Sequence, residues 1–210
     1  MIVENPIILD DVIPEKYQEE ILHTLTMREF DWHYNPHVSY NTKSNITLNF
    51  KKQDTKIEES RAFIHRFYVS KNDTDQPFLI KSEYCDFIRP ILYFVEQRLN
   101  LDIKEIIRIR GVLVPKDISM KDFYNVPHTD KFFPHKTLIY YVTDNDGGTI
   151  LFKEKYDAQS VDEKINYSKK TKEHFVKSKK GRVLLFDGLK YHTGVVPTDN
   201  DKILININFI

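Results

Sequence analysis

His128 and Asp130 place an imidazole and a carboxylate two residues apart in the second half of the chain. In an extended strand this spacing points both side chains to the same face, where they can bind one metal ion. A second imidazole is available from His192, which follows a predicted strand and the turn Asp187-Gly188. Two neutral imidazoles and one carboxylate leave three positions of an octahedral ion open. A non-haem Fe(II) centre needs this arrangement to hold a bidentate co-substrate and O₂.

The His-x-Asp spacing is a weak signal by itself, because the chain has eight histidines and such pairs arise by chance. A closed structural zinc site is less favoured, since it takes four ligands that usually include thiolates. The chain has a single cysteine, Cys85. One cysteine also excludes an internal disulfide and indicates a reducing compartment.

Further candidate binding residues are Lys202 and the pair Tyr140-Tyr141. Lys202 leads an alternating apolar segment, so it is either an edge charge that faces solvent or an inward partner for an anion. Alternation places Tyr140 and Tyr141 on opposite faces of their strand, so only one of them points into a barrel. Spacing alone leaves both questions open.

The elements that must position these residues are short strands. From Ile103 onward, apolar runs of strand length are separated by turn signals such as Asp144–Gly148. The runs span residues 106–115, 137–143, 149–153, 175–177, 182–186 and 203–209. This pattern is typical of a small antiparallel barrel or sandwich and not of βαβ units.

The first half of the sequence predicts a supporting layer. Helical spacing of apolar residues predicts one helix over about Pro14–Arg28 and another over about Leu79–Leu99, in which Pro90 kinks the helix or starts a new one. Alternation between His37 and Ser70 suggests strands or a hairpin. We interpret residues 1–210 as one domain, with support in 1–102 and the β core in 103–210.

Composition limits the function classes. Lysine plus arginine and aspartate plus glutamate number 31 each, which argues against a protein that holds duplex nucleic acid. The sequence has no apolar run long enough to span a membrane and no basic leader before an apolar stretch. We therefore expect a cytoplasmic protein without a membrane partner. The amino-acid usage suggests an AT-rich microbial or viral source, and for a virus or phage the compartment is the host cytoplasm.

The ordered set of motifs resembles the Fe(II)- and 2-oxoglutarate-dependent dioxygenases, and within them the prolyl-hydroxylase-like branch, including uncharacterised phage members. The resemblance covers about Ile106 to Ile210. It is carried by His128-x-Asp130, the segments 137–142, 147–152 and 180–186, His192, Lys202 and the terminal alternating strand. It implies a mainly β fold in which N-terminal helices support a double-stranded β-helix core of the jelly-roll or cupin-like kind.

The resemblance also implies roles for individual residues. His128, Asp130 and His192 match the iron ligands and form the catalytic centre. Lys202 matches the residue that binds the distal carboxylate of 2-oxoglutarate, and Tyr141 the tyrosine that hydrogen-bonds the same group. Two further residues would line that pocket, namely Thr137 and Ile150.

The implied reaction is hydroxylation of an unactivated C–H bond, with succinate and CO₂ as co-products and ascorbate as a further candidate cofactor. The carboxylate of Asp130 favours hydroxylation, because halogenating members of the superfamily lack it. Proline in a protein or peptide is the first candidate substrate. Pro127 and the segment 122–125 depart from the tyrosine-rich approach of animal and plant prolyl hydroxylases, which leaves the substrate open. A candidate substrate rim comprises Phe123, Tyr124, Lys131, Phe132, Phe133 and His135.

Two other functions remain in view. The first is the same chemistry on a small metabolite or a nucleobase. The nucleobase version is disfavoured, because nucleic-acid demethylases end with paired arginines where this chain has Asn206, Asn208 and Ile210. The second is a non-catalytic metal-binding β-helix that acts as an interaction protein. The sequence does not specify an oligomeric state.

Overall fold

The computed structural model describes residues 5–36, 38, 58–73, 79–157 and 170–210. The alternating residues Ile46, Leu48 and Phe50, and also His37, lie outside the described residues. Within the described part, no helix is long and apolar enough to cross a membrane.

The larger sheet has eight strands, all paired antiparallel, in the order β1-β9-β6-β11-β5-β3-β2, with β4 paired to β3. The strand bounds are β1 Ile7–Leu9, β2 His33–Asn35, β3 Ala62–Val69, β4 Ile80–Lys81, β5 Ile106–Val114, β6 Lys136–Tyr141, β9 Val183–Asp187 and β11 Lys202–Phe209. The longer apolar runs predicted from the sequence thus form neighbouring strands in the middle of this sheet.

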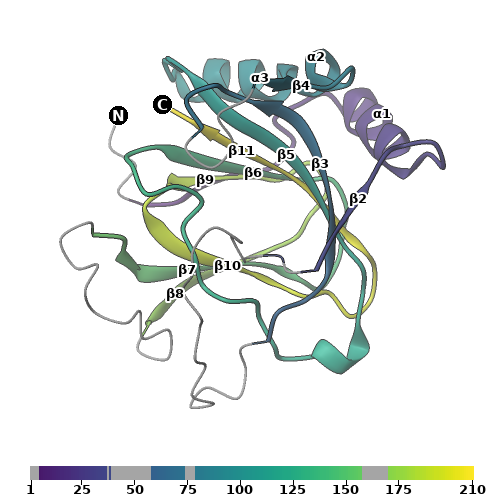
Figure 1. Cartoon of the computed structure of the whole chain (residues 1–210), viewed down its shortest axis with the longest axis vertical. Helices are drawn as coiled ribbons and strands as arrows, with labels where there is room; N and C mark the ends of the chain where they lie inside the picture. Colours follow the sequence, from purple (N-terminus) through teal and green to yellow (C-terminus); the bar gives the residue numbers. More distant parts are fainter. Residues whose placement is uncertain (1–4, 37, 39–57, 74–78, 158–169) are drawn as a thin grey trace.

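A smaller sheet with the order β10-β7-β8 faces the larger one (Figure 1). Its strands are β7 Gly148–Lys155, β8 Lys172–Lys177 and β10 Lys190–Val195. Two stacked antiparallel sheets confirm the predicted mainly β architecture without βαβ units. The strand β10 has no counterpart among the predicted runs, because its short sequence Lys190–Val195 contains two glycine or threonine positions and few apolar residues.

Helices cover the outer face of the larger sheet (Figure 1). They are α1 Glu15–Thr26, α2 Cys85–Ile88 and α3 Pro90–Leu99, and a short 3₁₀ turn η1 spans Ile118–Met120. The prediction of a helix from Leu79 was wrong at its start, because Ile80–Lys81 pairs with β3 and the helix begins only at Cys85. Pro90 starts α3, where its missing N–H costs no hydrogen bond.

The last strand, β11, separates two hydrophobic cores. Its odd-numbered residues, such as Ile203 and Ile205, pack in the core beneath the helices. Its residue Leu204 packs between the two sheets, in a core that includes Leu151 and Val176. Because side chains alternate along a strand, the remaining even-numbered residues of β11 also face the space between the sheets. These residues are Lys202, Asn206 and Asn208.

Candidate metal and co-substrate site

The two predicted imidazole ligands are brought together by a backbone bridge. The N–H of His128 donates to the carbonyl of His192 at 2.9 Å, and the N–H of His192 donates to the carbonyl of His128 at 2.9 Å. The two ring centroids lie 4.6 Å apart. The unpredicted strand β10 therefore positions His192 against the segment that contains His128 and Asp130.

Hydrogen bonds to backbone carbonyls orient both rings. Nδ1 of His128 lies 3.0 Å from the carbonyl oxygen of Val126, and Nδ1 of His192 lies 3.2 Å from that of Lys190. A carbonyl only accepts, so each Nδ1 donates its hydrogen and each neutral ring keeps a lone pair on Nε2. One ligand atom from each of His128, Asp130 and His192 lies within 4.8 Å of the others. This donor set suits an octahedral metal with open positions.

Asp130 is surrounded by polar and cationic side chains. Its Oδ1 accepts a hydrogen bond from Nη2 of Arg108 at 2.9 Å, and Nη2 of Arg110 lies 3.8 Å away. Its Oδ2 accepts from Nδ2 of Asn206 and of Asn208, each at 3.0 Å. The same Oδ2 lies 3.7 Å from Nε2 of His192. The carboxylate is thus fixed in position with one oxygen directed toward the histidines.

The charges around the three residues favour the protonation states that a metal requires. Burial and the neighbouring His192 lower the pKa of His128 to about 4, and burial also lowers the pKa of His192. Burial acts to raise the pKa of Asp130, but the positive charge of Arg108 and other neighbours outweighs it and holds this pKa well below its usual range. At neutral pH the site therefore presents two neutral imidazoles and one carboxylate.

Lys202 lies inside the barrel, at the other end of β11 from Asn208. Its side chain is 1% exposed, and Nζ donates to the backbone carbonyls of Val195 and Gly148. Among the described residues, no carboxylate forms an ion pair with it, and burial lowers its pKa to about 7. Gly194 approaches this amine closely, since a Cβ there would lie 3.3 Å from Nζ. The structure therefore places Lys202 inward, with backbone carbonyls as its hydrogen-bond partners among the described residues.

The tyrosine pair divides between the two cores. Tyr141 packs between the sheets and its hydroxyl donates to Oγ1 of Thr149 at 2.7 Å. Burial raises the pKa of Tyr141, so its phenol stays protonated and can donate a hydrogen bond. Tyr140 packs beneath the helices. Of the two tyrosines, Tyr141 is the one on the barrel side.

Several solved structures share this architecture. A 2OG-Fe(II) oxygenase family oxidoreductase from Burkholderia pseudomallei aligns over 97% of this chain and 84% of its own, with a TM-score of 0.61 and 10% identity. The chain has the fold of these oxygenases. A prolyl hydroxylase from Trichoplax adhaerens, in complex with a hypoxia inducible factor peptide fragment, aligns over 98% and 83%, with a TM-score of 0.55 and 14% identity.

A third structure with the oxygenase fold is the epimerase SnoN in complex with Fe³⁺, alpha ketoglutarate and nogalamycin RO. It aligns over 98% of this chain and 78% of its own, with a TM-score of 0.55 and 11% identity. No protein-family model and no curated protein matches the sequence. The expected double-stranded β-helix is confirmed by these structures.

Two residues predicted to line the co-substrate pocket lie on different faces of their strands relative to the barrel interior. Thr137 lies at the metal end of the barrel, where its Oγ1 is 3.5 Å from Oδ2 of Asp130. Ile150 lies on the opposite face of β7 from Leu151, which is paired with His192, and it packs with Phe152 and Tyr191. The structure therefore does not bring Ile150 to Lys202, because pairing with β10 turns Thr149 and Leu151 inward instead.

Only some residues of the predicted substrate rim are exposed on the surface. Phe132 is 58% exposed and its ring lies 4.9 Å from that of Tyr156, and Phe133 lies 5.7 Å from the ring of His135. Tyr124 and His135 are buried packing residues, with His135 seated against Gly188. Lys131 forms a buried ion pair with Asp73 at 2.6 Å.

Arg108, Asn206 and Asn208 were not predicted as site residues. Each of them hydrogen-bonds Asp130, from strands that are 22, 76 and 78 residues away in the sequence. The available signal was the alternation of polar Asn206 and Asn208 with isoleucine in the last strand, where a barrel-facing position would normally be apolar.

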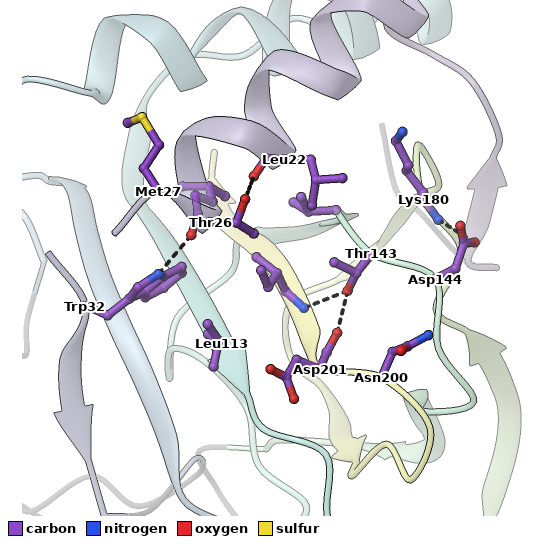
Figure 2. A pocket seen from close by; sticks show the side chains of 13 residues that line it. Leu22, Thr26, Met27, Trp32, Leu113, Thr143, Asp144, Lys180, Asn200 and Asp201 are labelled. Carbon is purple, nitrogen blue, oxygen red and sulfur yellow. Dashed lines mark hydrogen bonds between the residues drawn. The ribbon is translucent and has the colours of Figure 1, made fainter. Parts of the chain in front are cut away.

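A separate hollow of about 550 Å³ lies on the helix side of the larger sheet (Figure 2). Its walls include Leu22, Trp32 and Ile203, and none of the metal-cluster residues contributes to it. The Trp32 indole donates to the carbonyl of Leu25 at 3.0 Å, and Oγ1 of Thr143 donates to the carbonyl of Asp201 at 2.9 Å. This hollow is therefore distinct from the metal and co-substrate site.

Proposed function

We propose that this protein is an Fe(II)- and 2-oxoglutarate-dependent dioxygenase that hydroxylates an unactivated C–H bond. The observation that supports this most strongly is the placement of two features in one barrel. A cluster of two imidazoles and a carboxylate lies at one end, and a buried amine without a carboxylate partner among the described residues lies at the other. The first suits a metal with open positions, and the second suits one end of a small dianion.

When bound, Fe(II) and 2-oxoglutarate supply activation of O₂ and oxidative decarboxylation to succinate and CO₂. The chain holds and orients them. His128 and His192 offer Nε2 lone pairs, and Asp130 offers an oxygen that its amide and guanidinium neighbours fix in place. Such neighbours hold a ligating carboxylate in the geometry that the metal requires.

Lys202 and Tyr141 would bind the distal carboxylate of 2-oxoglutarate. Both side chains are buried, so a contact between the ammonium and the carboxylate forms away from water and is stronger than on the surface. The amine hydrogen-bonds only to backbone carbonyls in the described part of the chain, so an incoming carboxylate would provide the negative charge that it lacks. We assign no role in this pocket to Ile150.

We propose a prolyl residue of a protein or peptide as the first candidate substrate. This proposal is supported by the Trichoplax prolyl hydroxylase, which shares the fold and is in complex with a peptide fragment. A small metabolite is the second candidate, since the SnoN complex holds the small molecule nogalamycin RO. We further propose that residues 1–210 act as one cytoplasmic oxygenase domain, with ascorbate as a reductant that sustains activity.

Peptide hydroxylation tests the substrate proposal. Protein reconstituted with Fe(II) would be incubated with 2-oxoglutarate, O₂ and a mixture of proline-containing peptides, and products would be analysed by mass spectrometry. We expect a peptide mass gain of one oxygen atom that matches the succinate formed, and none with His128→Ala protein. Succinate without any peptide product would reject the prolyl substrate and favour the small-molecule alternative.

A further inference from the structure

Three arginines line the barrel side of two neighbouring strands beside Asp130. Arg66 of β3 is paired directly with Arg110 of β5, and Arg108 lies two residues before Arg110 on the same face. Arg110 is in turn paired with Asn206 of β11, and Arg108 with Asn208. The three guanidinium groups therefore extend the wall that holds the metal-binding carboxylate.

Negative charge around these arginines is scarce. Oδ1 of Asp130 faces both Arg108 at 2.9 Å and Arg110 at 3.8 Å, so one carboxylate oxygen serves two cations. Asp73 lies nearby but is bound to Lys131 at 2.6 Å. Within the described ranges, no ion pair involves Arg66. The cluster thus carries more positive than negative charge before any metal binds.

Hydrogen-bond donors in the cluster are also unused. Nε of Arg108 and Nε of Arg110 are buried and have no acceptor among the described residues. A buried donor without a partner costs free energy, and a guanidinium group presents its donors in a fork that matches two oxygens of a carboxylate or phosphate. The side chains of Arg108 and Arg110 are 13% and 18% exposed, so part of each side chain is accessible although its Nε is buried.

The arginines are separate from the co-substrate amine. Lys202 is paired with Val114, whereas Arg110 is paired with Asn206, four residues further along β11. Four residues of a strand span roughly 13 Å at ~3.3 Å per residue. The barrel therefore has two cationic regions with the metal ligands next to the second one.

We propose that Arg66 and Arg110, together with Arg108, bind an oxyanion group of the substrate, a carboxylate or a phosphate, beside the metal. This inference rests on the proposed oxygenase function, since it assigns the second ligand of the same site. The bound oxyanion accepts from the unused guanidinium donors and balances the excess charge. The substrate, a peptide or a small molecule, would thereby carry a carboxylate or phosphate group that binds beside the metal-binding residues.

Inorganic phosphate is the probe that tests this subsite. The protein would be loaded with Mn²⁺ and N-oxalylglycine, an inert 2-oxoglutarate analogue, so that the Lys202 region is occupied, and phosphate would be titrated by calorimetry. We expect phosphate to bind, and the Kd to rise at least about tenfold in the double variant R66Q/R110Q. The matched control is R89Q, because Arg89 is an exposed arginine that packs over Tyr93, and its Kd should equal that of the unaltered protein.

The design separates the inference from the oxygenase proposal. Unchanged phosphate affinity in R66Q/R110Q would overturn the oxyanion subsite, and so would phosphate binding that occurs only without the analogue, because the arginines would then serve the co-substrate. If the double variant does not fold, judged by its melting temperature and Mn²⁺ affinity, the single variant R66Q takes its place, since Arg66 is only half-buried. Absence of succinate formation with phosphate binding intact would reject the oxygenase function and leave the anion site standing.

Discussion

The barrel side of β11 carries the buried cation Lys202 at its start, and near its end Asn206 and Asn208 contact the carboxylate of Asp130. The Lys202 amine contacts two backbone carbonyls and has no carboxylate partner in the described part of the chain. Asp130, by contrast, accepts hydrogen bonds from an arginine and two asparagines and lies beside two imidazoles. The Lys202 end of the barrel thus has no carboxylate partner among the described residues. At the other end, the carboxylate of Asp130 lies beside the Nε2 atoms of the two histidines.

This difference indicates what each end binds. An ammonium group buried without a counter-charge is destabilised, so burial favours the neutral amine of Lys202 unless an anion binds beside it. A carboxylate fixed by several donors beside two imidazoles forms a donor set that could hold a metal ion. In the proposed function, the same strand would align a co-substrate carboxylate with a metal centre.

The largest expected effect comes from removing the carboxylate of Asp130. Asp130→Ala should lower Mn²⁺ affinity by more than about 100-fold, because it deletes a ligand and leaves Arg108 unopposed beside the site. Isothermal titration calorimetry would measure the affinity. Asp102→Ala is the matched control, since the Asp102 side chain is 75% exposed. An affinity within threefold of the unaltered protein would show that Asp130 is not a ligand.

The next largest effect should come from removing the charge of Lys202. Lys202→Met keeps the length of the side chain and removes its charge, so binding of N-oxalylglycine to the Mn²⁺-loaded protein should weaken by about 30-fold or more. Mn²⁺ affinity itself should change less than twofold, because the amine is not a metal ligand. Lys104→Met, at a 69% exposed side chain, serves as control. Equal losses of Mn²⁺ affinity and N-oxalylglycine affinity would mean that Lys202 also affects metal binding.

A smaller effect should follow when one donor to Asp130 is removed. Asn208→Leu deletes a 3.0 Å hydrogen bond to Oδ2, and the loss of such a supporting contact typically costs about tenfold in metal affinity. Analogue affinity at saturating Mn²⁺ should stay unchanged. Calorimetry on the same samples would give both values. If Mn²⁺ binding is unaffected, the hydrogen bonds around Asp130 serve folding and not the metal.

The smallest predicted effect is a pH dependence of N-oxalylglycine binding that comes from Lys202. Since burial lowers the pKa of Lys202 to about 7, the unliganded protein loses this proton as the pH rises above 7, and a bound carboxylate must recover it. Affinity for N-oxalylglycine should therefore fall about fivefold from pH 7 to pH 8. Lys202→Arg should flatten this dependence, because arginine stays protonated. A slope that survives in Lys202→Arg would assign the titration to another group.

The sequence predicted the long central strands of the larger sheet well, because their apolar runs are long or strictly alternating, as in β5 and β11, but it did not predict the short strands β1, β2 and β4. It predicted β10 poorly and missed the face of Ile150, since a shift of one position reverses every side chain of a strand. The actual partner of His192 in β7 is Leu151. Register between distant strands is set by tertiary packing, which a single sequence does not reveal.

The metal-binding residues were found through their order along the chain, whereas the residues that support them were not. Arg108, Asn206 and Asn208 reach Asp130 only because β5, β6 and β11 lie side by side. The sequence shows that these three residues are polar, but it does not show that all three contact Asp130. Contacts between strands that are tens of residues apart depend on the folded sheet.

The most direct test of the account is oxidative decarboxylation of 2-oxoglutarate by the protein itself. Protein reconstituted anaerobically with Fe(II) would receive 2-oxoglutarate and ¹⁸O₂, and the succinate formed would be quantified by mass spectrometry beside an Asp130→Ala sample. We predict succinate that contains one ¹⁸O atom, with formation abolished in the variant. Succinate at the same level in both samples, or none from the unaltered protein with any candidate substrate mixture, would contradict the proposed function.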